Sequence, residues 1–233
     1  MTQRRSNLLL LAASLGAAPW AAAQPVATAQ FACAPIAIAG HYGPFDYVYQ
    51  RNALVIVETA HFTSQVESLR GGIAGFLGHD ISYTLNASPN HHRALLAAMR
   101  YSIREKKDQP PHMSYSTSCY FDRATRFRPK DTVVRGLYAK YLLDFMRQKD
   151  EALRQVNVAV EFAGDNPLTH HNAGMLYFEM GEFVKAAERA VRARELGYPR
   201  EDLIDKLRSV NHWAVTSPSP AASSSVPPTP QNP

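Results

Sequence analysis

The stretch PLTHHNAGMLYFEMGEFVKAAERAVRARELGYP, residues 167–199, predicts a helical hairpin. Apolar and small side chains recur at helical spacing on both sides of Gly181, which marks a tight turn between two amphipathic runs. Small residues such as Ala173 and Gly174 allow two helix backbones to approach closely. A single hairpin leaves part of its apolar surface uncovered, so this stretch requires neighbouring hairpins.

The segment just upstream repeats the same pattern. Ala152 and Ala159 precede Ala186 and Ala193 by about 34 residues, which is the period of one class of helical-hairpin repeat. On these residues the chain resembles the tetratricopeptide repeat (TPR) family, whose characteristic positions in the last hairpin are occupied by Gly174, Tyr177, Gly181, Ala186, Ala193 and Pro199. The preceding hairpin is a weaker match, with Lys140 at the glycine position. The resemblance implies an all-α, TPR-like α-solenoid of about three to four helical hairpins.

Composition changes along the chain predict four segments. Residues 1–23 carry Arg4 and Arg5 before the apolar run LLLLAASLGAA and end in small residues, which is typical of a Sec-type signal peptide cleaved after Ala23. A twin-arginine signal is the alternative, although Asn7 stands where that pattern has an apolar residue. Residues 24–60 are expected to form an irregular N-terminal arm, residues 61–213 the helical repeat domain, and residues 214–233 a disordered Ser/Pro-rich tail.

Several local expectations follow within these segments. The run NALVIVET is rich in branched residues and is expected to be extended, and the arm's Tyr42, Phe45, Tyr47 and Tyr49 are expected to cover the first repeat. Helices are expected to resume near His61. A loop at residues 106–118 interrupts one repeat, and residues 200–213 are expected to form a capping helix.

Export changes the meaning of the two cysteines. In an oxidising compartment a lone pair of cysteines usually forms a disulfide, so we predict a Cys33–Cys119 bridge and a periplasmic or secreted protein. Two buried free thiols are the alternative. With no C-x-x-C pair, a zinc site or a thiol redox centre is not expected.

Neither composition nor motifs point to an enzyme. The net charge of +5 includes Arg4 and Arg5 and is too small for a nucleic-acid-binding footprint. The pairs His91-His92 and His170-His171 lack metal-ligand spacing, and both are expected to be capping and solvent-facing polar residues. We therefore predict no catalytic residues, no cofactor and no metal.

The family resemblance implies that the first helix of each hairpin lines a concave groove. Carried onto this chain, the peptide-binding groove comprises Met99, Leu137, Tyr138, Tyr141, Asp144, His171, Asn172, Met175 and Phe178. The expected partner is a protein or peptide segment of the cell envelope, with Tyr141 and Phe178 contributing most to binding.

Three alternatives to this groove remain. In the first, the N-terminal arm or the capping helix itself occupies the groove. A binding surface on the 106–118 loop or on the basic face around Arg126 is the second. The third is an enzyme or carbohydrate-active accessory protein that uses a His/Tyr/Asp cluster in the groove.

Overall fold

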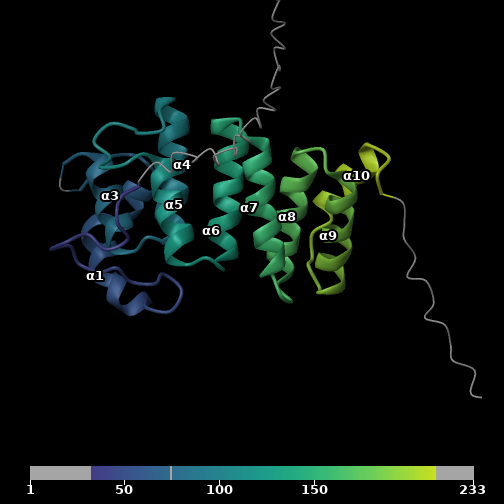
Figure 1. The fold of residues 1–233 in the computed structure, drawn as a ribbon, viewed down its shortest axis with the longest axis horizontal. Coiled ribbons are helices and arrows are strands. Elements are labelled where there is room, and N and C mark those ends of the chain that lie inside the picture. Colours follow the sequence, from purple (N-terminus) through teal and green to yellow (C-terminus); the bar gives the residue numbers. More distant parts are fainter. Residues whose placement is uncertain (1–32, 74, 214–233) are drawn as a thin grey trace, which may run out of the picture. The chain divides into compact units, whose positions relative to one another are not determined.

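The computed structural model describes residues 33–73 and 75–213, and every regular element in these residues is helical (Figure 1). The all-α prediction is therefore confirmed. The helices are α1 (Arg51–His61), α2 (Ser64–Glu67), α3 (Leu77–Ala87), α4 (His92–Glu105), α5 (Thr117–Phe127), α6 (Thr132–Tyr141), the π-helical η1 (Leu142–Met146), α7 (Lys149–Glu161), α8 (Pro167–Glu179), α9 (Phe183–Glu195) and α10 (Asp202–Ser209). The predicted signal peptide, residues 24–32 of the arm and the predicted tail lie outside the described residues. No helix within residues 33–73 and 75–213 has both the length and the apolar character needed to cross a lipid bilayer.

The hairpin predicted from residues 167–199 is present as α8 and α9. Gly181 turns the chain between them with a positive φ of 76°. Gly174 allows close packing, because a Cβ at this position would lie 2.4 Å from Leu203 Cδ2. Tyr177 is buried between the helices, and its hydroxyl donates a hydrogen bond to Asn157 Oδ1 of α7 at 2.7 Å. The hairpin is thus fixed to the helix that precedes it.

Successive helices pack against one another through two buried clusters. One cluster joins α2 to α6 and includes Leu95 and Phe121; the other joins α6 to α10 and includes Val156 and Leu176. Helix α6 contacts both α7 and α8, and α10 packs against α9 and α8. Three apolar residues of α10 are buried there, namely Leu203, Ile204 and Leu207. The prediction of a further helix on the last hairpin is confirmed.

Four of the helices begin at a residue whose side chain accepts a hydrogen bond from a backbone N–H in the first turn. These capping residues are His91 for α4, Ser116 for α5, Asp131 for α6 and Asn166 for α8. Each satisfies an N–H group that has no partner inside the helix. The cap positions explain why these helices start where they do.

The first helix lies where an extended arm was expected. The run NALVIVET belongs to α1, so the helices begin at Arg51 rather than at His61, and the segment after His61 contains only the one-turn helix α2. Leu54 and Val57 are buried, whereas Val55 and Ile56 are exposed. Burial three residues apart is the period of a helix face, and packing of this face against α3 overrides the β propensity of the branched residues.

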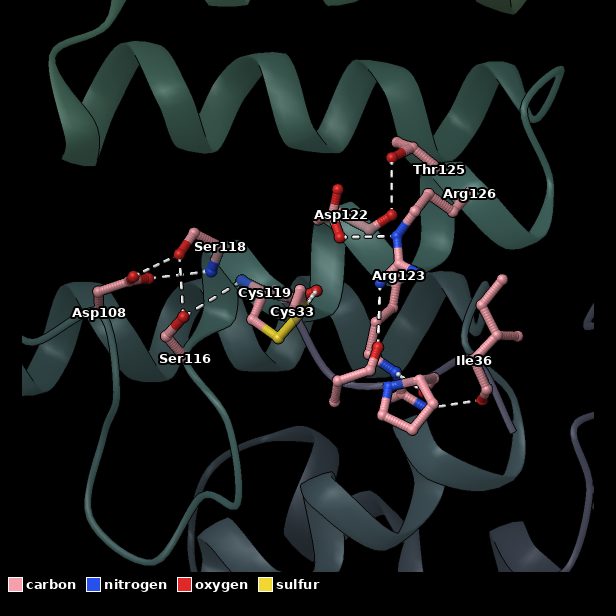
Figure 2. Close-up of a disulfide and its surroundings, with 12 residues drawn as sticks. Cys33, Ile36, Asp108, Ser116, Ser118, Cys119, Asp122, Arg123, Thr125 and Arg126 are labelled. Carbon is pink, nitrogen blue, oxygen red and sulfur yellow. Dashed lines mark hydrogen bonds and ion pairs between the residues drawn. A yellow bond between two sulfur atoms is a disulfide. The ribbon is translucent and has the colours of Figure 1, made fainter. Parts of the chain in front are cut away.

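The described part of the arm forms a strap, defined here as residues 33–38, which is fixed to α5 (Figure 2). The predicted Cys33–Cys119 disulfide is present, with the two Cα atoms 5.4 Å apart. Arg126 Nη2 donates to the Ala34 carbonyl at 3.0 Å. Arg123 is fully buried and donates to the carbonyls of Pro35 and Ile36, at 3.0 and 2.9 Å. The disulfide and three hydrogen bonds therefore hold the strap on one helix.

The aromatic residues after the strap cover less of the core than expected. Tyr47 is buried and packs against His91, with ring centroids 4.2 Å apart. Tyr49 is 74% exposed. Tyr42 is 44% exposed, and its hydroxyl donates to the Ala53 carbonyl of α1 at 3.3 Å. The expectation is correct for Tyr47, correct in part for Tyr42 and the half-buried Phe45, and wrong for Tyr49. The bond from Phe45 N to the Ala87 carbonyl holds the segment at the end of α3.

Candidate binding groove between α6 and α8

An apolar groove of about 290 Å³ lies between α6 and α8, and we call it the α6–α8 groove. Its walls are one face of each helix, with residues spaced three or four apart. The α6 face presents Val133, Gly136, Leu137 and Lys140; the α8 face presents Leu168, Asn172, Met175 and Glu179. Val156 and Ala159 of α7 also line it. An apolar concavity with a few polar groups at its edge is typical of a ligand-binding site.

The end of the groove near the start of both helices is apolar and open. Val133 is 44% exposed and Leu168 is 52% exposed, although both are large apolar residues. Beside them the Thr132 and Thr169 hydroxyls lie 3.3 Å apart and connect the first turns of the two helices. This end therefore presents apolar surface to solvent while the helices themselves are held in register.

The opposite end of the groove is charged. Lys140 Nζ lies 2.6 Å from Glu179 Oε2 and 3.1 Å from Asp144 Oδ2. Burial would lower the pKa of Lys140, but the hydrogen bonds that its ammonium group donates to Glu179 and Asp144 outweigh this effect, so the pKa is raised. The ammonium group stays charged at neutral pH. Two carboxylates against one ammonium leave an excess negative charge at this end.

Three of the nine residues predicted from sequence line the groove, namely Leu137, Asn172 and Met175. Asp144 borders it through Lys140. Tyr138 is half-buried and its ring stacks on Phe121 at a centroid distance of 5.0 Å. Phe178 is half-buried and packs edge-on against Phe183 at 5.3 Å. Neither aromatic ring is part of the groove wall.

Met99, Tyr141 and His171 are buried and do not form a surface for a partner, which corrects their assignment to the groove. Tyr141 is fully buried, and its hydroxyl donates to Asp108 Oδ1 at 2.6 Å. Burial is the first cause that raises its pKa, and the bond to Asp108 adds to it. The His171 ring stacks on Tyr198 at 4.2 Å. Tyr141 and His171 thus contact neighbouring loops and Met99 lies in a buried cluster, which repeat spacing alone does not reveal.

Sequence reasoning missed the groove residues that repeat the helical period on the solvent side. Val133, Gly136 and Lys140 lie one turn apart on α6, and Glu179 lies one turn after Met175 on α8. These residues could have been found from the sequence. Asp131 and Asn166 are recognisable caps that fix where α6 and α8 begin, and residues three or four apart then share one face of each helix. The sequence prediction instead favoured aromatic residues, which pack against other aromatic rings in the fold.

The capping interpretation is confirmed for His91. It is wrong for His170 and His171, which are buried residues within α8, a helix capped by Asn166. His91 Nδ1 accepts the Ala94 N–H at 3.1 Å, so the proton is on Nε2, which lies 2.9 Å from Glu58 Oε1. Burial lowers the pKa of His91 to about 3. His92 Nε2 bonds Asp131 at 2.8 Å, and His170 Nε2 lies 2.9 Å from the Gly164 carbonyl. In the part of the chain that the structure describes, no three His, Cys, Asp or Glu residues are grouped as a metal site.

The loop between α4 and α5 is held at both ends by hydrogen bonds. Asp108 Oδ1 accepts from the Ser118 backbone N–H at 2.9 Å and from Tyr141. The Asp108 carbonyl accepts from the Thr117 N–H at 2.7 Å, and Ser102 Oγ lies 2.7 Å from Thr117 Oγ1. These bonds give the loop a structural role in covering Tyr141.

The strap and α10 do not line the groove. Its lining residues all belong to α6, α7, α8 and the Asn166 cap. The strap is attached to α5, and α10 packs on α9 and α8 from outside the groove wall. The described part of the arm and the capping helix thus leave the α6–α8 groove open.

Comparison of this chain with protein-family models, with curated proteins and with solved structures finds no match.

Proposed function

We propose that this chain is a TPR-like α-solenoid that binds a peptide segment of another protein in the α6–α8 groove, without catalysing a reaction. The observation that carries the proposal is the groove itself, which is apolar, open and lined by the first helices of two successive hairpins. This is the surface where the family resemblance places a ligand. Exposed Val133 and Leu168 favour the same conclusion, because adjacent large apolar side chains in water are typical of an interaction site.

The proposal includes export to an oxidising compartment. The Cys33–Cys119 disulfide supports it, since such bonds persist mainly outside the reducing cytosol. The expected partner is therefore a protein of the cell envelope or of the exterior. The alternative of a His/Tyr/Asp active site in the groove has no support, because Tyr141 bonds Asp108 in the core while His171 stacks on Tyr198.

Two matched variants test the proposal. Leu168 and Val184 are each the second residue of a helix, α8 and α9, and they are 52% and 71% exposed. Only Leu168 lines the groove. A random 12-residue peptide library displayed on phage is selected against the full chain, and dissociation constants of the selected peptides are measured by calorimetry.

Leu168→Glu is expected to weaken binding at least about tenfold, because it places a charge on an apolar contact. Val184→Glu is expected to leave the dissociation constant unchanged. If no selected peptide distinguishes Leu168→Glu from Val184→Glu, peptide binding in the groove is ruled out.

A further inference from the structure

Gly136 lies in the middle of α6 without a structural reason to be glycine. Glycine inside a helix costs about 1 kcal/mol relative to alanine. Each of the other glycines in the described residues either has a positive φ or has another atom within 3.2 Å of where a Cβ would lie. At Gly136 the backbone is helical, and nothing lies within 4 Å of that position.

The empty space above Gly136 belongs to the groove. Gly136 shares its helix face with Val133, Leu137 and Lys140, all of which line the cavity. The missing side chain therefore exposes the α6 backbone at the centre of that wall. A group that enters the groove approaches the helix here more closely than at any position carrying a Cβ.

The groove is apolar at one end and charged at the other, and Gly136 lies between the two ends. Val133 and Leu168 form the apolar end. At the other end the two carboxylates of Glu179 and Asp144 face the single ammonium group of Lys140. A cavity of about 290 Å³ has room for one large side chain and part of its backbone; by comparison, an apolar protein cavity of about 150 Å³ holds a benzene ring.

We propose that the segment bound in the groove inserts one bulky apolar side chain over Gly136 and places a Lys or Arg near Glu179 and Asp144. This inference rests on the proposed function and specifies the ligand of that site. Gly136 leaves room for a large inserted side chain, since a Cβ at this position would occupy part of the space above the helix. The carboxylate excess favours a cation on the ligand, which gains charge-assisted hydrogen bonds there.

The test uses peptides selected from the random library against the full chain, with affinities measured for the parent protein and for Gly136→Ala and Glu179→Gln. The selected peptides are expected to share a large apolar residue followed or preceded by Lys or Arg. Gly136→Ala is expected to weaken their binding at least about tenfold. It is also expected to raise the midpoint of urea unfolding, so weaker binding would not reflect a loss of folding.

Peptide variants isolate the two contacts. When the bulky residue of the peptide is changed to alanine, Gly136→Ala is expected to lose its effect. When the peptide's Lys is changed to norleucine, Glu179→Gln is expected to lose its effect. Coupling of this kind distinguishes direct contact from a general change in the groove.

The outcomes separate this inference from the proposed function. Peptides that depend on Leu168 but bind Gly136→Ala and Glu179→Gln as tightly as the parent would overturn the inference and leave groove binding intact. Peptides enriched in acidic residues would overturn it as well. If no selected peptide depends on Leu168, both proposals fail.

Discussion

Two glycines on the neighbouring helices α6 and α8 have opposite environments. Gly174 of α8 lies against Leu203 and Arg189, whereas Gly136 of α6 faces open space. Substitution of Gly174 by leucine is expected to lower the free energy of unfolding by about 1–3 kcal/mol, because the added side chain overpacks the contact with α10. Gly136→Leu is the matched control and is expected to cause no loss, since leucine is the better helix former by up to about 1 kcal/mol.

Urea unfolding of the two leucine variants measures this difference. A Gly174→Leu protein as stable as the Gly136→Leu protein would contradict the packing of α8 against α9 and α10. The comparison also tests the repeat register, because the TPR resemblance places Gly174 at a position that has to be small.

Sequence predicted some groove residues and misplaced others for a physical reason. Leu137, Asn172 and Met175 were found because helical spacing fixes which residues share a helix face. Tyr141 was placed in the groove wrongly, since it is fully buried and its hydroxyl bonds Asp108. Asp108 lies in a loop whose course no local pattern specifies. Aromatic residues near a groove were taken as binding residues, but Tyr141 completes a buried cluster instead.

At the scale of elements, the N-terminus of α4 depends on a neutral histidine. His91 accepts the Ala94 N–H through Nδ1, and protonation would remove this acceptor. Burial, and to a lesser extent Arg93 and Arg51, hold the pKa of His91 at about 3 in the folded chain, against 6.5 as its ordinary value. The unfolded chain therefore takes up a proton near pH 6.5, and the folded chain does so only near pH 3.

This difference predicts how stability changes with pH. The stabilisation is fully present above pH 6.5 and is lost as pH falls toward 3, with a limiting slope of about 1.4 kcal/mol per pH unit. His91→Asn keeps a capping oxygen and removes the titration. Urea midpoints measured between pH 7 and about 5, above the range where most carboxylates titrate, are expected to fall for the parent and to stay nearly level for the variant. Parallel curves for the two proteins would show that His91 is not buried in its neutral form.

Element boundaries were predictable where caps and turns are encoded locally. The prolines, the Asn166 cap and Gly181 place α8 and α9 within a few residues. Helix α1 was misread, because Val55, Ile56 and Val57 have a high β propensity and only tertiary packing selects the helix. The strap was expected as irregular chain, but its attachment through the buried Arg123 was not, since that contact joins residues far apart in sequence.

At the scale of the molecule, the disulfide and the strap reinforce the same region. A bridge that spans 86 residues restricts the unfolded chain and, on loop entropy, contributes about 4 kcal/mol to stability. It connects the strap to α5, while the groove lies between α6 and α8. The residues that hold the strap and those that line the groove are therefore separate sets, which leaves the groove free to bind.

Hydrogen–deuterium exchange of the full chain, with and without a selected peptide, tests groove binding most directly. The account predicts slower exchange of backbone amides in α6 and α8 when the peptide is bound, with the α4–α5 loop and α5 unchanged. The 106–118 loop and the region around Arg126 are the alternative surfaces. Slower exchange confined to either of them, with α6 and α8 unaffected, would contradict the account.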